Sequence, residues 1–520
     1  ETGHAYPAAV AGGSDWLGQP SRSQTLAEKP EQHGDTTEAL TSNALLEEVY
    51  RLALELRPQL GEGLRVTLDS ALDRDLGFDS LSRVELAVRL ERLFGVAIPE
   101  QALASAETLR ELWEAMSTVD AEARQQAPQL ERAGAGLNRL SETPDSVGTL
   151  TGMLEWHVQQ HPQRPHVQLY GDADTPESIT YLELDQGARA LAAGLQDMGV
   201  LPGQTVAIML PTSRDYLVSF FGILLAGAIP VPIYPPLRPS QLEDHLRRHA
   251  GILSNAQSVL LITLKKAQGI AQLLKSQVDT LREVMTPEQL AVPNGRFTRP
   301  AVQSEDIAFL QYTSGSTGAP KGVILTHADL LANIRAMGNA VHADSTDVFV
   351  SWLPLYHDMG LIGAWLGSLY FGMSLVLMSP LAFLTRPRRW LWTIHRHGGT
   401  LTAAPNFAYE LCLSKLHDQD LEGLDLSSLR LAFNGAEPVS PNTMRHFSER
   451  FASYGLRDQA LAPVYGLAEA AVGLAFPPPE RGVLIDRIRR DPFAASGTAV
   501  PAAETDPDFL EFVACGQPLP

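Results

Sequence analysis

A short loop rich in glycine and hydroxyl side chains, YTSGSTGAPKGV at residues 312–323, constrains the fold more than any other stretch of the chain. The apolar residues 307–310 predict a strand that leads into the loop, and residues 323–325 predict a strand that leaves it. Gly315 and Gly318 allow positive φ angles and a close approach of the backbone to a ligand. A flexible Ser/Gly linker is the alternative, but linkers are rarely bracketed by two apolar strands.

The composition of this loop predicts a phosphate-binding site. Hydroxyl groups, successive backbone N–H groups and a lysine can converge on phosphate oxygens. The loop is not a Walker A loop, because no Ser or Thr follows the lysine, and it lacks the GxGxxG spacing of a dinucleotide fingerprint. The candidate phosphate ligands are Thr313, Ser314, Gly315, Ser316, Thr317, Gly318 and Lys321.

The loop resembles, almost letter for letter, the phosphate loop of the adenylate-forming superfamily. That superfamily includes acyl-CoA synthetases, luciferases and the adenylation domains of nonribosomal peptide synthetases, which convert a carboxylate and ATP into an acyl-adenylate and pyrophosphate. The resemblance implies ATP and Mg²⁺ as cofactors. It also implies an α/β large domain of layered subdomains, followed by the start of a β-rich subdomain.

Two later runs agree with the resemblance in the order that the superfamily has them. Residues 430–438, RLAFNGAEP, contain an Asn-Gly turn signal and resemble the strand and turn that lie along the adenine. Residues 464–469, VYGLAE, resemble the next signature, in which a tyrosine stacks on adenine and a glutamate holds magnesium. One carboxylate suffices, because a magnesium ion that bridges phosphates keeps several waters. The resemblance therefore implies adenine contacts from Asn434, Gly435, Ala436, Glu437, Tyr465 and Gly466, and a magnesium ligand at Glu469.

Two features favour one branch of the superfamily, the fatty acyl-AMP ligases. Most relatives have threonine before the glutamate, whereas this chain has Ala468, as that branch often does. The second feature is the run SWLPLYHDMGL at residues 351–361, with adjacent His357 and Asp358. Metal ligation is the alternative for this pair, but no third ligand lies at a suitable spacing. The resemblance places both residues near the substrate carboxylate, which a protonated imidazole could complement.

Several aromatic residues near this run are candidates for the wall of an acyl tunnel. Most aromatic residues of a large domain belong to its core, so the sequence does not decide which of them would face a ligand. The candidates are Trp365, Tyr370, Phe371, Phe383, Phe407 and Tyr409.

The N-terminal part predicts a separate, small all-α bundle. Apolar stripes at helical spacing occur in residues 45–56, 84–90 and 109–116. The run LGFDSL at residues 76–81 contains a common helix N-cap pair, Asp79-Ser80. It also resembles the phosphopantetheine site of acyl carrier proteins, where a phosphodiester at a helix N-terminus is favoured by the helix dipole. The resemblance implies 4'-phosphopantetheine on Ser80, attached by a phosphopantetheinyl transferase.

The sequence around Ser80 is acidic. Such a face would attract basic patches on partner enzymes. The acidic residues are Asp73, Asp75, Asp79, Glu85 and Glu91.

Length and composition indicate a multidomain protein. A chain of 520 residues is long for one core. We expect a linker at 1–40, a carrier domain at 41–118, a second linker at 119–147 and the adenylate-forming large domain at 148–520. The net charge of −20 argues against a nucleic-acid partner, and two cysteines exclude a disulfide framework.

Location is also suggested by the sequence. No secretory signal leads the chain, which predicts a cytoplasmic protein. The apolar run 216–234 is long enough to suggest a membrane span, but glycines and prolines interrupt it. A buried helix followed by a strand is the better prediction.

The resemblance implies more chain than is present. Relatives in the superfamily continue into a strand-rich region with a ribose-binding aspartate and then a small lid domain with a catalytic lysine, so we expect a longer enzyme. The Pro- and charge-rich segment 477–508 resembles the insertion that distinguishes fatty acyl-AMP ligases and hinders reaction with CoA. A dispensable surface loop is the alternative for this segment.

The expected function is ATP-dependent activation of a fatty acid as its acyl-adenylate. The acyl group would then pass to a carrier thiol, on this chain or downstream, to load a polyketide or lipopeptide assembly line. The alternatives are an acyl-CoA synthetase with an appended carrier, and an inactive scaffold that presents a carrier. Intact Lys321 and Glu469 argue against the scaffold.

Overall fold

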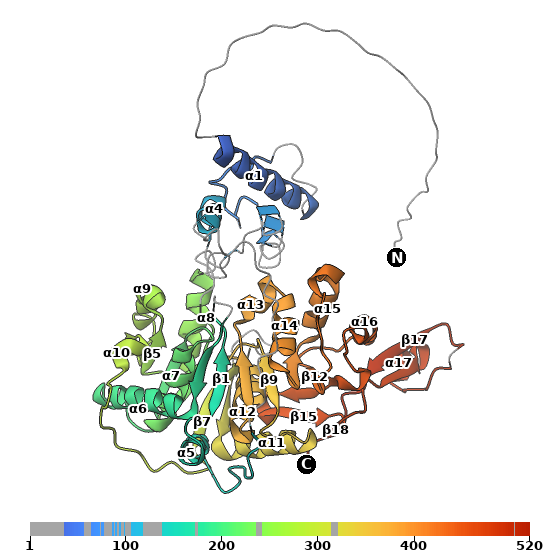
Figure 1. The fold of residues 1–520 in the computed structure, drawn as a ribbon. Coiled ribbons are helices and arrows are strands. Elements are labelled where there is room, and N and C mark those ends of the chain that lie inside the picture. Colours follow the sequence, from blue (N-terminus) through green and yellow to red (C-terminus); the bar gives the residue numbers. More distant parts are fainter. Residues whose placement is uncertain are drawn as a thin grey trace, which may run out of the picture.

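The structure is a computed structural model, and it divides into a small helical N-terminal part and a large α/β part (Figure 1). The residues that it describes are 36–56, 64–72, 74–76, 78, 86–87, 89–90, 93–94, 98, 106–117, 138–171, 175–235, 242–313, 321–503 and 505–520.

The N-terminal part has a hydrophobic core of its own. Helices α1 (Thr36–Leu56) and α4 (Leu109–Ser117) carry the first and last of the expected apolar stripes. Leu45, Val49 and Leu112 on these stripes are fully buried. They belong to one cluster that also contains Leu72, Leu76, Phe78, Leu86 and Leu90. The expected carrier-type helical bundle is therefore confirmed as a separate packing unit.

Parallel strands form the centre of the large part. A seven-stranded sheet has the order β13-β12-β11-β9-β10-β1-β2, and every pair in it is parallel except β1–β2. Strands β11 and β12 are buried at every residue, as expected for a parallel sheet that is covered on both faces. The strands are β1 (Pro165–Leu169), β2 (Glu177–Thr180), β9 (Val348–Ser351), β10 (Ser374–Leu377), β11 (Leu401–Ala404), β12 (Leu431–Asn434) and β13 (Leu461–Pro463).

A second, four-stranded parallel sheet has the order β4-β3-β5-β6. Its strands are β3 (Thr205–Met209), β4 (Ile229–Pro232), β5 (Leu260–Thr263) and β6 (Glu283–Met285). The apolar run that suggested a membrane span forms the buried helix α7 (Arg214–Leu225) and then β4, which confirms the prediction. Among the residues described, no helix has the length and apolar character that a membrane crossing requires.

Antiparallel elements complete the large part. The expected strands around the phosphate loop pair as a hairpin of β7 (Ile307–Thr313) and β8 (Lys321–Thr326). Strands β14 (Tyr465–Leu467), β15 (Val472–Phe476) and β18 (Gln517–Pro518) form a small sheet.

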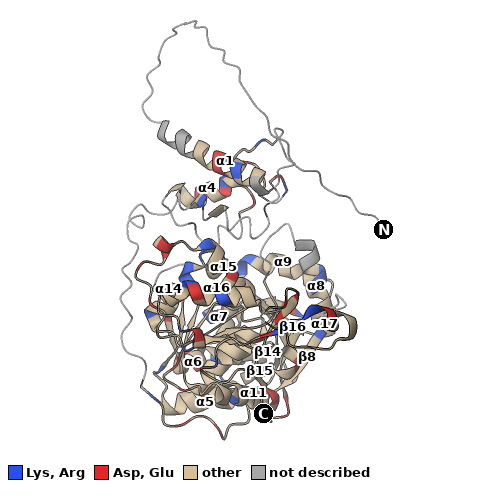
Figure 2. Ribbon diagram, turned by 90° about the vertical axis from the view of Figure 1, so that its right-hand side faces the viewer, with Lys and Arg blue, Asp and Glu red and all other residues tan. Residues whose placement is uncertain are grey.

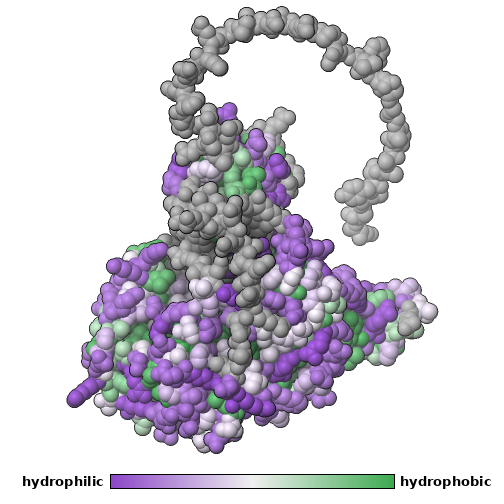
Figure 3. Space-filling view, in the orientation of Figure 1, coloured by the Kyte–Doolittle hydropathy of each residue, from purple (hydrophilic) through white to green (hydrophobic). Residues whose placement is uncertain are grey.

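Most of the Pro- and charge-rich segment 477–508 lies in a projecting arm (Figure 1). Strands β16 (Ile485–Arg489) and β17 (Phe509–Val513) pair antiparallel, with α17 (Arg490–Ser496) between them. Glu511 of β17 lies 3.3 Å from Arg445 on α16 (Pro441–Ala452), so the arm is attached to the large part near its base. Figure 3 shows that the face of the large part turned toward the viewer is mainly hydrophilic, with small separate apolar patches.

A buried carboxylate joins three strands of the seven-stranded sheet at their amino ends through an ion pair and a hydroxyl hydrogen bond. Arg430, before β12, donates Nε and Nη2 to the carboxylate of Asp347, before β9, at 2.8 and 2.6 Å. Thr400, before β11, donates its hydroxyl to the same carboxylate at 2.7 Å. The Asp347 side chain is only 6% exposed, so it depends on these donors.

We expect Arg430→Ala to lower the free energy of unfolding by about 3 kcal/mol, because it leaves a buried carboxylate without its cation. Urea unfolding of the large part measures this change. The control is Arg214→Ala, which removes an ion pair with Glu177 whose side chains are 40% and 46% exposed, and it should cost less than about 1 kcal/mol. Equal losses in both variants would contradict the importance of the buried pair.

Candidate active site

A cavity of about 320 Å³ lies beside the carboxyl ends of β9, β12 and β13, which is the edge where parallel α/β sheets bind ligands. It is bounded by β14 and β15 and by the helix α11 (His327–Ala340). Eight of the residues expected at the site line this cavity, although they come from separate segments of the chain. They are Thr313, His357, Asp358, Gly435, Ala436, Tyr465, Gly466 and Glu469.

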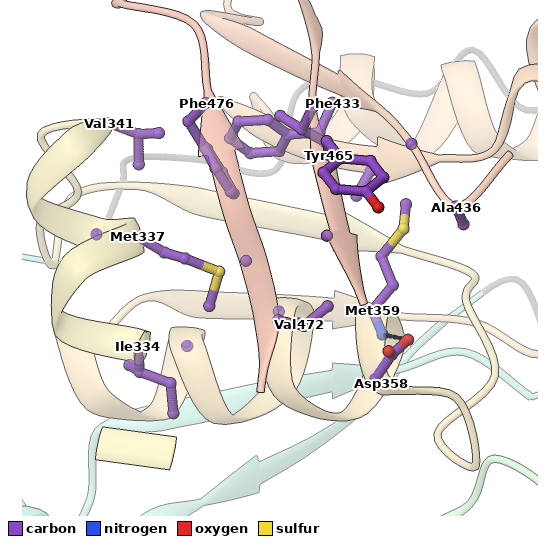
Figure 4. A pocket seen from close by; sticks show the side chains of 18 of the residues that line it. Ile334, Met337, Val341, Asp358, Met359, Phe433, Ala436, Tyr465, Val472 and Phe476 are labelled. Carbon is purple, nitrogen blue, oxygen red and sulfur yellow. Dashed lines mark hydrogen bonds between the residues drawn. The ribbon is translucent and has the colours of Figure 1, made fainter. Parts of the chain in front are cut away.

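One end of the cavity has the form of a slot for a flat ring. Gly435 and Ala436 follow β12 and offer bare backbone, and the Tyr465 side chain is 55% exposed beside them (Figure 4). A Cβ on Gly466 would lie 1.7 Å from the carbonyl oxygen of Val472, so only glycine fits there. The exposed tyrosine ring can stack on an aromatic base at this end.

Backbone strain marks the same end. Val472 lines the cavity with a φ of 87°, a conformation that β-branched residues rarely adopt. Ala436 has a φ of 71° and Ala471 a φ of 53°. Such strain gathers at ligand sites, where the surrounding structure imposes it.

Two residues that were expected to contact adenine, Asn434 and Glu437, are not among the residues that line the cavity. They support the slot from outside it. Asn434 is fully buried, and its amide donates to Asn406 Oδ1 at 3.2 Å. Glu437 accepts a hydrogen bond from the backbone N–H of Phe407 at 2.6 Å. The structure therefore separates both side chains from the eight lining residues.

The phosphate loop connects two residues that pair with each other. Thr313, the last residue of β7, pairs with Lys321, the first residue of β8, and only Thr313 is among the lining residues. Ser314, Gly315, Ser316, Thr317 and Gly318 lie outside the described residues, as does Ser80.

Glu469 occupies a 3-10 turn, η7 (Ala468–Ala470), that packs against β8. Its exposed carboxylate lines the cavity close to the hairpin that carries the phosphate loop. This arrangement fits Mg²⁺, which takes one or two protein carboxylates and completes its shell with phosphate oxygens and water. Among the described residues no group of three or more His, Cys, Asp or Glu could hold a metal by itself.

A histidine–aspartate pair also lines the cavity. His357 Nδ1 lies 2.8 Å from Asp358 Oδ1, and the side chains are 52% and 12% exposed. Asp358 also accepts the N–H of Met359 at the start of η4 (Met359–Leu366). Burial disfavours the charged imidazole, but the hydrogen bond and charge of Asp358 together outweigh it and raise the pKa of His357 above its usual value.

The other end of the cavity is apolar. Helix α11 contributes Ile334 and Met337, and Val341 follows it (Figure 4). Sequence analysis missed these residues, although their spacing of three and four along a helix was visible. Of the six aromatic candidates, only Phe371 lines the cavity. The remaining apolar wall comes from Phe349, Met373, Leu401, Phe433 and Phe476.

Two glycines keep this apolar end open. Gly363 lies in η4 and Gly367 begins α12 (Gly367–Phe371), and both line the cavity. A Cβ on Gly363 would meet nothing within 4 Å, and a Cβ on Gly367 would meet only the Ile362 carbonyl oxygen at 3.5 Å. Glycine costs a helix about 0.5–1 kcal/mol relative to alanine, and helical π-turns concentrate at functional sites. Because neither glycine has a side chain, both positions leave space inside the cavity.

Comparison with known proteins agrees with this geometry. The AMP-binding enzyme family matches residues 154–505, and the phosphopantetheine attachment site family matches residues 51–116. JamA of Moorena producens, a medium-chain-fatty-acid–[acyl-carrier-protein] ligase, is 36% identical over 62% of this chain and 55% of its own length. FadD32 of Mycobacterium marinum, a long-chain-fatty-acid–AMP ligase, is 39% identical over 60% of this chain and 50% of its own length. The chain thus spans about half the length of these curated relatives.

Solved structures give the same result. The fatty acyl-adenylate ligase of Legionella pneumophila, in complex with acyl adenylate and pyrophosphate, has a TM-score of 0.68 and 33% identity over 73% of this chain and 65% of that chain. The expected resemblance to adenylate-forming enzymes, with a carrier-type N-terminal part, is thereby confirmed. Because the match extends over more than half of its residues, the chain belongs to the family of AMP-binding enzymes.

Proposed function

We propose that this chain carries the adenylate-forming part of a fatty acyl-AMP ligase together with an acyl carrier domain. The observation that carries the proposal is a single cavity with three kinds of wall: a nucleotide-type slot at Tyr465, a cation-forming pair at His357 and an apolar end at α11. A fatty acyl-adenylate has three corresponding parts: a nucleotide, a former carboxylate and an aliphatic chain.

In the first proposed step, a carboxylate oxygen of the fatty acid bonds to the α-phosphorus of ATP, and the bond from that phosphorus to the bridging oxygen breaks as pyrophosphate leaves. The Thr313–Lys321 loop offers donors and one positive charge to the phosphates, and preorganised charge of this kind lowers the barrier. Mg²⁺ on Glu469 supplies further positive charge when bound. Protonated His357 orients the carboxylate, and the apolar end holds the chain.

In the second step, a pantetheine thiol attacks the acyl carbonyl, loses its proton and displaces AMP. We place the pantetheine on Ser80, which lies within the residues that match the phosphopantetheine attachment site family. A phosphopantetheinyl transferase and assembly-line synthase modules are the partners that this reaction requires. The cytoplasmic location stays a prediction of the sequence.

Product analysis tests the proposal directly. The full-length protein, treated with a phosphopantetheinyl transferase and CoA, should gain one phosphopantetheine that Ser80→Ala abolishes. With ATP and a panel of carboxylates, mass spectrometry should then detect fatty acyl-AMP and acylated carrier, with little acyl-CoA. Ready formation of acyl-CoA at saturating CoA would favour an acyl-CoA synthetase instead, and no adenylate with any acid would favour the inactive scaffold.

Lys321→Ala and Glu469→Ala should each lower the rate of acyl-adenylate formation by about a hundredfold, the scale of losing one positioned electrostatic group. Exchange of radioactive pyrophosphate into ATP measures this rate. Lys275→Ala is the matched control, because Lys275 forms only a surface ion pair with Glu283 at 2.9 Å. Wild-type rates in both site variants would show that the phosphate site lies elsewhere.

The pH dependence of adenylate formation should follow the charge of His357. Since Asp358 raises the pKa of His357, the imidazole stays protonated to a higher pH than an ordinary histidine, and the rate should fall as pH rises through that pKa. Asp358→Asn removes the carboxylate charge and keeps a side chain able to cap η4, so the fall should move to lower pH. The surface variant Asp279→Asn is the control. If Asp358→Asn has the same pH–rate profile as this control, the charge of His357 does not govern adenylate formation.

Gly363→Leu should shorten the acyl chain that the enzyme accepts. The new side chain would enter the open space of the cavity and displace about two methylenes of substrate, each worth about 0.8 kcal/mol, so kcat/KM for the longest acids should fall about tenfold. Shorter acids should be unaffected. Gly251→Leu on α8 (Leu242–Asn255) is the control, because a Cβ there also meets nothing within 4 Å but lies outside the cavity. The same loss for all chain lengths would mean that Gly363 does not limit chain length.

A further inference from the structure

The N-terminal helical part touches the large part at a short helix, α13 (Pro380–Thr385), and the residues that follow it. Arg386 donates Nη2 to the backbone carbonyl oxygen of Ile98 at 3.1 Å. Leu384 packs against the core of the N-terminal part and also against the core of the large part. Figure 1 shows α1 and α4 above α13. An apolar anchor and a charged donor therefore lie side by side at this contact.

The contact lies on the functional edge of the sheet. Helix α13 follows β10 directly, so it stands at the carboxyl ends of the parallel strands, where the cavity also opens. Phe383 of α13 stacks on Trp352, with ring centroids 4.0 Å apart and planes at 13°. Trp352 belongs to the run 351–361, which also contains His357 and Asp358. The contact is thus linked, through one pair of packed rings, to the segment that carries the histidine–aspartate pair of the candidate active site.

Charge distinguishes this surface from the rest of an acidic protein. The chain has 60 acidic and 40 basic residues, yet no Asp or Glu occurs between Asp358 and Glu410. That stretch places Arg386, Arg388 and Arg389 directly after α13, and Arg388 also lies 3.7 Å from Asp420. Figure 2 shows blue ribbon segments, which mark Lys and Arg, near α14 (Arg388–His397) and α15 (Asn406–Lys415), together with some red segments that mark Asp and Glu. The sequence near Ser80 is acidic, so its charge is opposite to that of these arginines.

We propose that α13 and the arginines that follow it at 386–389 form a docking surface for the carrier domain of this same chain. Leu384 is its apolar anchor, and Arg386 fixes the orientation through Ile98. Residues 118–137 tether the carrier, so even a weak contact is populated, because a tether raises the effective concentration to the millimolar range. Docking at this edge favours transfer of the acyl group to Ser80 of the same chain over transfer to a separate carrier. This last consequence rests on the proposed function, whereas the contact does not.

Hydrogen exchange measured by mass spectrometry tests the contact on the chain without any activity. In Arg386→Glu, peptides that contain residues 93–98 and 380–389 should exchange faster than in the wild type, and more so at low salt, where charge matters most. Arg296→Glu, the same charge change on an exposed loop residue, should leave both peptides unchanged. Leu384→Ala is a second variant that removes the apolar anchor without adding charge. If hydrogen exchange in these peptides is unchanged in both Arg386→Glu and Leu384→Ala, the proposal is wrong.

The full-length protein with phosphopantetheinylated Ser80 tests the consequence. Arg386→Glu should slow acyl transfer to its own carrier about tenfold, the scale of one charged hydrogen bond, while adenylate formation keeps its wild-type rate. If Arg386→Glu speeds hydrogen exchange but leaves the rate of acyl transfer unchanged, the docking surface has no role in transfer. Loss of adenylate formation in the wild type would instead overturn the proposed function, and the exchange experiment would still decide on the contact.

Discussion

The carboxyl edge of the seven-stranded parallel sheet is the constraint on which the site depends. Parallel strands leave all their carboxyl ends at one edge, so the turns after β9, β12 and β13 meet there despite their distance in sequence. The ion pair between Arg430 and Asp347, together with the Thr400 hydroxyl, joins three of these strands at the opposite, amino edge. Rigid strands fixed at one edge allow a strained turn, such as the one after β12 where Ala436 has a φ of 71°, to persist at the other.

The cavity combines walls of opposite character in one space. Glycines give it room, since side chains at Gly363 or Gly466 would fill the apolar end or collide with backbone. The cavity has few polar side chains, and Asp358 raises the pKa of its neighbour His357. A site of this kind selects a ligand that is part nucleotide and part hydrocarbon. Either half alone would leave the other wall of the cavity without a contact.

Much of the site could be predicted because its polar members sit in short runs. Tyr465, Gly466 and Glu469 lie within one such run, and a run of this kind keeps its local shape. Asn434 and Glu437 belong to an equally clear run, yet their side chains support the slot from outside its lining. Neighbours in a strand or turn point in different directions, so a motif identifies a segment better than it identifies each contact.

The strand–loop–strand around the phosphate loop, the separate helical N-terminal core and the order of the signature runs follow from local periodicity and turn chemistry, so they could be predicted from the sequence. The part of the apolar wall that α11 forms and the contact of Arg386, after α13, with Ile98 depend on tertiary packing. Apolar helical stripes show that a face is buried, but which neighbour buries it depends on how distant strands pair. That pairing brings Met337 to the cavity and makes Leu384 part of two cores.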